Sequence, residues 1–178
     1  MVRIPNSERL RFELLNHDHA DLLFNLDQDP DVMRFINGGK PSTRKEIETK
    51  YLPRMESYTT PENGWGIWGT WLTESNEFIG WILVRPMHFF DEARNDDDLE
   101  LGWRFMKPAW GKGYATEAAQ AVMRSLESIG CQQFSALAEE ENEASINVMK
   151  KLGMEYVRKA LHKDPLGDAE VVYFTRKV

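Results

Sequence analysis

The chain has 178 residues, with 22 basic and 29 acidic side chains and a net charge of −7 at pH 7. This balance argues against an extended nucleic-acid surface, whereas a cationic small substrate fits it. The length suits a single domain over residues 1–178, large enough to bury a core without disulfides or a structural metal. The one cysteine, Cys131, excludes an internal disulfide and is expected in the core.

Membrane insertion, metal binding and a catalytic triad are not expected. No apolar run approaches the roughly 20 residues of a membrane span, and no signal pattern opens the chain. The four histidines are scattered, without a partnered Asp or Ser at a diagnostic spacing, and no metal-ligand cluster is present. We therefore expect a soluble cytoplasmic protein with no metal and with neither nucleic acid nor membrane as a partner.

The first half of the chain predicts one strand, several helices and a hairpin. Leu10, Phe12 and Leu14 alternate with charged residues, which is the period of a half-buried strand. Helices are expected over residues 18–26, from an Asp29 N-cap to the glycines at 38–39, and from a Ser42 N-cap to about residue 58. The hairpin strands are expected over residues 66–72 and 77–84.

The second half predicts two strand–helix pairs and a closing hairpin. A strand over residues 99–106 leads into a glycine turn, and apolar residues at helical spacing follow from Tyr114 to Ile129, with Gly130 as C′ residue. A strand over residues 134–138 precedes a helix that Asn142 opens and Gly153 ends. The last two strands cover residues 155–161 and 169–176.

This order of elements predicts a mixed α/β fold. Seven strands form a mostly antiparallel sheet flanked by helices. The only parallel crossover runs from the strand at 99–106 through the helix at 114–129 to the strand at 134–138.

The glycine turn at residues 110–118, WGKGYATEA, indicates a phosphate site. Gly111 and Gly113 let the backbone approach an anion without a Cβ in the way, and the free N–H groups of the next helix point at the same place. A P-loop requires the motif Gly-x4-Gly-Lys-Ser/Thr, which is absent, and a dinucleotide fingerprint requires a third glycine or alanine at the position of Thr116. A helix entry that is merely rich in glycine is the alternative.

Four segments together resemble the GNAT superfamily of acyl-CoA-dependent N-acetyltransferases, in the branch similar to ribosomal-protein N-terminal acetyltransferases. These segments are residues 7–11 (SERLR), 29–33 (DPDVM) before two glycines, 100–103 (ELGW) leading into the glycine turn, and 142–145 (NEAS) leading into 151–154 (KLGM). The resemblance spans almost the whole chain. It departs from the family pattern at Trp110, the first position of the pyrophosphate motif.

The resemblance implies how coenzyme A is bound. The strands at 99–106 and 134–138 would open as a V for the pantetheine arm, with main-chain contacts from Phe105 and Met106. A bulge at Gly102 would splay them. The backbone amides of residues 111–116 would hold the diphosphate, and Lys112 would add a point charge or remain a solvated loop residue. The cofactor-binding residues would thus be Phe105, Met106, Gly111, Lys112, Gly113, Tyr114, Ala115, Thr116 and Asn142.

The chemistry requires a base, because amines are mostly protonated at neutral pH. Glu100 is the candidate: it alternates away from Leu99 and Leu101 yet lies in an apolar strand, and it would act directly or through water. A glutamate that faces solvent at a strand edge is the alternative. The resemblance implies a proton donor for the thiolate on the helix after 142. Met149 occupies the slot of the usual tyrosine, so Ser145, one turn earlier, is the candidate replacement. Asn142 is either a pure N-cap or also a hydrogen-bond donor to the coenzyme or a water.

The expected function is transfer of acetyl from acetyl-CoA to a primary amine by direct attack. A non-catalytic acyl-CoA sensor is the alternative reading. Protein N-termini, polyamines, amino acids and aminoglycosides all fit as acceptors, and either a monomer or a homodimer is compatible. Five acidic residues before Glu100 either surround the acceptor entrance and attract a cationic acceptor, or form an ordinary solvated loop: Asp91, Glu92, Asp96, Asp97 and Asp98.

Overall fold

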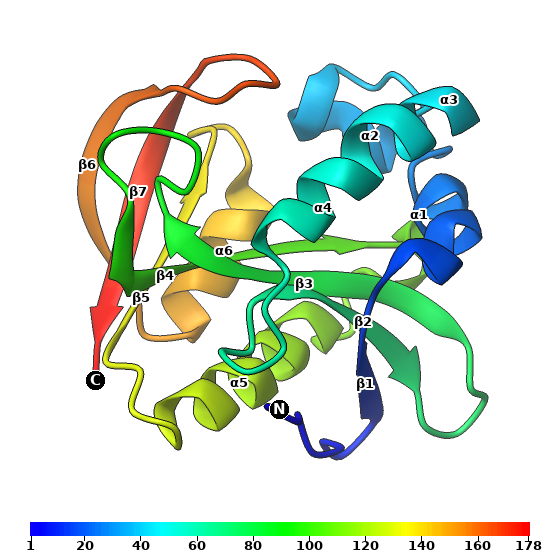
Figure 1. Ribbon diagram of the computed structural model, residues 1–178, viewed down its shortest axis with the longest axis horizontal. Coiled ribbons are helices and arrows are strands. Elements are labelled where there is room, and N and C mark those ends of the chain that lie inside the picture. Colours follow the sequence, from blue (N-terminus) through cyan, green and yellow to red (C-terminus); the bar gives the residue numbers. More distant parts are fainter.

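The computed structural model describes residues 1–178, and its seven strands form one sheet (Figure 1). The strand order is β1-β2-β3-β4-β5-β7-β6. All neighbouring strands are antiparallel except β4 and β5, which are parallel. The expected mixed α/β fold with one parallel crossover is therefore confirmed.

The elements follow the predicted order with few changes in their limits. The strands are β1 (Leu10–Leu14), β2 (Gly66–Leu72), β3 (Phe78–Met87), β4 (Asn95–Phe105), β5 (Gln133–Ala138), β6 (Glu155–His162) and β7 (Ala169–Lys177). The helices are α1 (Ala20–Leu26), α2 (Pro30–Asn37), α3 (Arg44–Glu46), α4 (Leu52–Tyr58), α5 (Tyr114–Glu127) and α6 (Glu143–Lys151). Short 3₁₀ turns cover His17–His19 and Lys107–Ala109, and a π-helical turn, Ile47–Tyr51, joins α3 to α4.

Helices cover both faces of the sheet (Figure 1). On one face, α5 and α6 bury a cluster that includes Leu99, Leu101 and Phe105 of β4. On the other face, α1 and α4 pack on a second cluster with residues of β2 and β3. Because side chains alternate along a strand, β4 contributes Leu99 and Leu101 to the first face and Glu100 to the second. The two faces of β4 therefore have different chemistry.

Several helix ends form as the sequence predicts. The Asp29 side chain accepts the Asp31 N–H, and Gly38 ends α2 in the left-handed conformation with φ +83°. The expected Ser42 cap is wrong. Thr43 caps α3 by accepting the Glu46 N–H, while the buried Ser42 hydroxyl donates to Asp27 at 2.6 Å. The other oxygen of this carboxylate pairs with Arg104 at 2.8 Å, so Ser42 satisfies the one that remains, and leaving a buried carboxylate oxygen unsatisfied would be costly.

Two details of the strands also differ from expectation. No register shift occurs at Gly102, which pairs regularly with Leu83, so the predicted bulge there is wrong. A Cβ at residue 102 would lie 3.3 Å from the Leu83 side chain, a tight contact that would require Leu83 to shift slightly. The irregularity instead falls between Pro86 and Met87, where β3 pairs with a β4 that already begins at Asn95.

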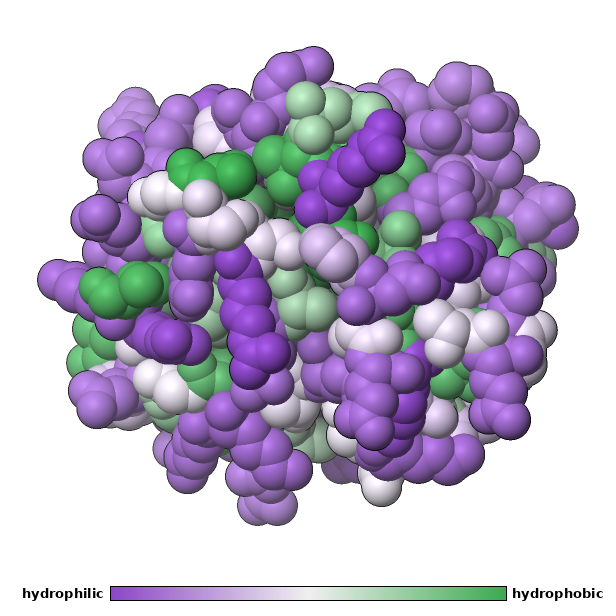
Figure 2. Space-filling view, turned by 90° about the horizontal axis from the view of Figure 1, so that it is seen from below, coloured by the Kyte–Doolittle hydropathy of each residue, from purple (hydrophilic) through white to green (hydrophobic).

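The surface is mainly polar on the side of α5. Figure 2 shows hydrophilic residues over most of this side, with smaller apolar patches between them. Cys131 is half-buried against the core cluster beneath α5 and α6, so it is covered less than expected. None of the helices combines the length and the hydrophobicity that crossing a bilayer demands.

Candidate active site

The parallel strands β4 and β5 pair over only two positions. Leu99 pairs with Phe134 and Glu100 with Ser135, both near the start of β5. Beyond them, β5 remains paired with β7 along its whole length, while β4 remains paired with β3 as far as Phe105. The carboxyl-terminal part of β4 therefore has no strand partner on the β5 side. This is the V-shaped opening expected between the two strands.

Phe105 is the last residue of β4, Met106 follows it, and the two have different neighbours. Phe105 lies opposite Gly80 of β3, and the N–H of Met106 donates to the Ile79 carbonyl at 2.8 Å. In an antiparallel ladder, this arrangement turns the N–H and C=O of Phe105 away from β3, toward the opening. The Trp110 indole donates to the Phe105 carbonyl at 2.9 Å. Of the two residues, Phe105 is thus oriented toward the opening, whereas the N–H of Met106 is used within the sheet.

The glycine turn that follows β4 has the backbone form that requires glycine. Gly111 and Gly113 have φ of +73° and +79°, in the left-handed region. Gly113 is the N-cap of α5, and the first helical hydrogen bond runs from the Glu117 N–H to its carbonyl at 3.0 Å. The N–H groups of Tyr114, Ala115 and Thr116 therefore have no acceptor within the helix. Together with the helix dipole, they favour an anion at this end of α5.

Lys112 lies exposed between the two glycines, and its ammonium forms no ion pair. Its carbonyl accepts a hydrogen bond from the guanidinium of Arg9 at 2.9 Å. The side chain thus remains free, as either a point charge for an anion or a solvated residue.

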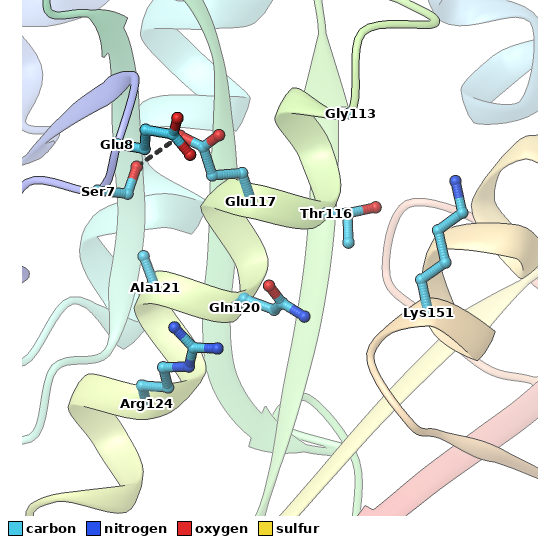
Figure 3. A pocket seen from close by; sticks show the side chains of 9 residues that line it. All are labelled: Ser7, Glu8, Gly113, Thr116, Glu117, Gln120, Ala121, Arg124 and Lys151. Carbon is cyan, nitrogen blue, oxygen red and sulfur yellow. Dashed lines mark hydrogen bonds between the residues drawn. The ribbon is translucent and has the colours of Figure 1, made fainter.

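A polar groove of about 470 Å³ begins at this turn and follows α5 (Figure 3). Gly113 and Thr116 lie at its upper end, and Lys151 of α6 faces them from across the groove. Arg124 lies further along α5, and neither this guanidinium nor the Lys151 ammonium has an ion-pair partner. Two unpaired cations and a helix start therefore line one groove, which suits a ligand with several phosphate groups.

Glu100 lies on the opposite face of β4 and is buried, with only 6% of its surface exposed. Arg85, its cross-strand partner on β3, donates from Nε to Oε2 at 3.0 Å and from Nη2 to Oε1 at 3.4 Å. The Arg85 guanidinium also lies over the rings of Tyr58 and Phe90. Both carboxylate oxygens are therefore already engaged, so a proton from a substrate must reach an oxygen that Arg85 also contacts.

Asn142 and Ser145 lie at the start of α6. The Asn142 side chain accepts the Ser145 N–H at 3.4 Å, so Asn142 is an N-cap. The half-buried Ser145 hydroxyl accepts a hydrogen bond from the Trp103 indole of β4 at 3.3 Å. Met149 is buried in the core. Ser145 therefore faces β4 on the α5–α6 side, whereas Glu100 lies on the other side of the sheet.

Folding also brings together residues that their sequence positions do not connect. His88, His162 and Tyr173 form a ring cluster on the Glu100 side, with centroids 5.6 to 6.1 Å apart. The Tyr173 hydroxyl lies 2.9 Å from Nδ1 of His162, and an Asp91 oxygen lies 3.1 Å from Nδ1 of His88. Burial lowers the pKa of His162 below its ordinary 6.5. The two histidines are 74 positions apart in the sequence, and no spacing signal indicates this contact.

A second contact missed in the sequence joins α4 to the turn between β6 and β7. Arg54 donates to Asp164 at 2.6 Å, with both side chains mostly covered, and its guanidinium lies 4.1 Å from the ring centre of Phe90. Desolvation raises the pKa of Asp164, but the hydrogen bonds from Arg54 and the Leu166 N–H, together with the nearby guanidinium charges, outweigh it, so this pKa lies below its usual value. The pair ties the final hairpin over the Glu100 side of the sheet.

The acidic residues before Glu100 have less free charge than the sequence indicates. Asp96 is paired with Arg94 at 2.6 Å, and Asp91 lies beside His88. Asp98 accepts the hydroxyl of Ser135, and burial raises its pKa. The acidic stretch is therefore only partly available to attract a cation.

Comparison with known proteins defines the class of this chain. Residues 9–155 match the family model described as acetyltransferase (GNAT) domain. The chain belongs to this family. It is 30% identical over 165 residues to the FsC-acetyl coenzyme A-N(2)-transacetylase of Aspergillus fumigatus, a match that covers 89% of this chain and 68% of that protein.

Solved structures support the fold. An acetyltransferase (GNAT family) from Bacillus anthracis has a TM-score of 0.73 and 22% identity, covering 97% of this chain and 96% of its own. The ribosomal alpha-N-protein acetyltransferase RimL, solved with coenzyme A, has a TM-score of 0.75 and 15% identity, covering 98% and 97%. The expected resemblance to the GNAT superfamily is thereby confirmed.

The buried histidine predicts how stability depends on pH. Because the folded state lowers the pKa of His162, the neutral imidazole stabilises the fold above the ordinary value of 6.5, and this stability is lost as pH falls through 6.5 toward the folded pKa. Denaturant unfolding should show a falling free energy of unfolding from about pH 7.5 to about pH 5.5, and His162→Asn should reduce this slope. His17→Asn, at a highly exposed histidine, is the control. An unchanged slope in His162→Asn would contradict the assignment.

Proposed function

We propose that this chain transfers the acetyl group of acetyl-CoA to a primary amine by direct attack, without an acyl-enzyme. The observation that carries the proposal is the opening between β4 and β5 directly beside a glycine turn that begins α5. The opening offers main-chain groups of Phe105 to an extended arm, and the turn offers N–H groups to a diphosphate. The relative solved with coenzyme A has the same fold, which supports this choice of cosubstrate.

Different residues along the groove contact different parts of the cosubstrate. The amides of Gly111, Lys112 and Gly113 and the first turn of α5 hold the diphosphate, with the Lys112 ammonium as an additional charge. Arg124 and Lys151 supply cations for a further phosphate group along the groove. Asn142 caps α6 and presents its amide to the coenzyme or to a water.

The reaction forms one C–N bond and breaks one C–S bond. The amine must first lose a proton, since only its neutral form has a lone pair for attack. Glu100 accepts that proton through an oxygen shared with Arg85, directly or by way of a water. The lone pair then attacks the thioester carbon, and the leaving thiolate takes a proton from the Ser145 hydroxyl. The second proton of the attacking nitrogen passes through solvent to the Ser145 alkoxide, which yields the amide and a free thiol. Glu100 then releases the first proton to solvent, so both side chains return to their starting state.

The acceptor is proposed as a primary amine on a small molecule or at a protein N-terminus. The Aspergillus fumigatus relative is named an N(2)-transacetylase, and RimL is named an alpha-N-protein acetyltransferase, so both names support nitrogen as the acceptor atom. A cationic acceptor is compatible with the acidic residues that stay unpaired, such as Asp97. Transfer to a nitrogen atom is the feature that the names of these two relatives share.

A non-catalytic acyl-CoA-binding role is the second candidate. The observation that favours it is the engagement of both Glu100 oxygens by Arg85, together with a buried Met149 in the position of the family's usual tyrosine. Release of free thiol from acetyl-CoA in the presence of a panel of amines and peptides separates the two candidates. Turnover with any acceptor rejects the sensor role.

The glycine turn can be tested with a matched pair of valine variants. Gly113→Val and Gly130→Val each place a branched residue at a positive φ, +79° and +101°, at opposite ends of α5. Each should lose about 1–3 kcal/mol of stability through backbone strain. Calorimetry should show coenzyme A affinity reduced by about tenfold or more in Gly113→Val alone, because only that side chain stands beside the anion site. Equal affinities in the two folded variants would remove the turn from the binding site.

The role of Glu100 can be tested by removing its ability to accept a proton. Glu100→Gln should lower turnover by a factor on the order of 10² if this carboxylate is the base, and Ser145→Ala should lower it less. Steady-state rates across pH, measured with the best acceptor of the panel, provide the test. A Glu100→Gln variant with the wild-type rate and pH profile would show that another group takes the proton.

A further inference from the structure

The segment before β1 is tied to the glycine turn, although the two are about a hundred residues apart in the chain. Arg9 Nε donates to Glu117 Oε1 at 2.7 Å, and Arg9 Nη1 donates to the Lys112 carbonyl at 2.9 Å. The Arg9 guanidinium also lies 4.3 Å from the ring centre of Tyr114. One side chain thus contacts residues just before, at and after the start of α5.

The carboxylate of Glu117 is held by three groups at once. Besides the guanidinium, it accepts the Arg9 backbone N–H at 3.0 Å and the Ser7 hydroxyl at 2.7 Å. Figure 3 shows Ser7 and Glu117 side by side at the edge of the groove, joined by this hydrogen bond. Desolvation raises the pKa of Glu117, but the hydrogen bonds from Ser7 and Arg9 outweigh it, so the pKa lies below its ordinary value. The carboxylate is therefore ionised at neutral pH.

An ionised carboxylate at this place poses an electrostatic problem. Glu117 lies in the first turn of α5 and lines the groove, where a diphosphate would bring negative charge. The groove has two acidic residues, Glu8 and Glu117, and two basic ones, Arg124 and Lys151. Pairing of Glu117 with Arg9 leaves one unpaired acid against two unpaired bases, so the groove becomes net positive.

We infer that Arg9 is a positioning residue for the cosubstrate: it neutralises Glu117 and holds the Lys112 carbonyl, so that the turn at 111–114 directs N–H groups and not negative charge toward the groove. Arg9 acts through Glu117 and Lys112 and is not itself a catalytic residue. This inference rests on the proposed function, because the anion it serves is the diphosphate of coenzyme A.

A double-mutant comparison tests the inference by calorimetric titration with coenzyme A. Arg9→Ala should raise the Kd by about tenfold, because it exposes the Glu117 charge at a phosphate site. Arg9→Ala with Glu117→Gln should recover at least about a third of the lost affinity, since the exposed charge is gone. A merely structural role of Arg9 would predict no recovery, because the second substitution removes one more native contact.

The matched control is Arg11→Ala, two residues further along the chain in β1. Arg11 is similarly exposed and is also engaged with an acid, Glu13, and an aromatic ring, Trp71, but it lies away from the turn. Its removal should leave the Kd for coenzyme A within about twofold of wild type. Circular dichroism confirms folding of each variant. If Arg9→Ala does not fold, Arg9→Lys replaces it in the test. This variant keeps the positive charge but loses the planar guanidinium that contacts Glu117 and Lys112 together, and it should raise the Kd for coenzyme A by about threefold.

The possible results separate this inference from the proposed function. A wild-type chain that does not bind coenzyme A overturns the proposed function, and this inference with it. Wild-type binding with an unchanged Kd in the folded Arg9 variant overturns this inference alone. A double variant that binds no better than Arg9→Ala also overturns it, as does an Arg11→Ala variant that weakens binding to the same extent.

Discussion

The constraint on which the structure depends is that β4 and β5 share only two paired positions, at Leu99–Phe134 and Glu100–Ser135. Each strand is held on its other side, β4 by β3 and β5 by β7, so the sheet remains continuous while its centre opens. The opening exposes main-chain groups at the carboxyl-terminal part of β4, which elsewhere in a sheet would be paired. A ligand with an extended amide-bearing arm is the natural partner for such groups. The position of the glycine turn immediately after β4 then places an anion site at one end of the same opening.

The residues with proposed roles in binding and catalysis lie on both faces of the open sheet. The α5–α6 face carries the polar groove, the unpaired Arg124 and Lys151, and the Ser145 hydroxyl next to Trp103. The other face carries the Glu100–Arg85 pair beneath α4 and the final hairpin. A buried ion pair is costly to desolvate and is weak evidence for stability alone. Its place beside the opening agrees with the proposed role of Glu100 in accepting a proton from the acceptor.

Much of the fold was predictable, because it follows from local signals. The alternation in β1, the caps at Asp29 and Asn142, and the left-handed glycines after α5 and α6 all lie within a few residues of the elements that they define. The glycine turn was predictable for the same reason. The Ser42 cap failed because Asp27, which is distant in sequence, competes for the hydroxyl.

The contacts around the site were less predictable, since they depend on pairing register and on chain segments far apart. Arg85 was missed because the strand was expected to end at Val84, whereas β3 continues to Met87 and pairs Arg85 with Glu100. The His88–His162 and Arg9–Glu117 contacts join distant segments through the finished sheet. No spacing in a single sequence indicates such contacts.

The most direct test of the central claim is a crystal structure of the chain with coenzyme A. The account predicts that the pantetheine arm lies between β4 and β5 and hydrogen bonds to the main chain of Phe105, while the diphosphate accepts N–H groups from residues 111–116. Coenzyme A bound elsewhere, with the opening between the strands empty and the turn free of phosphate, would contradict it.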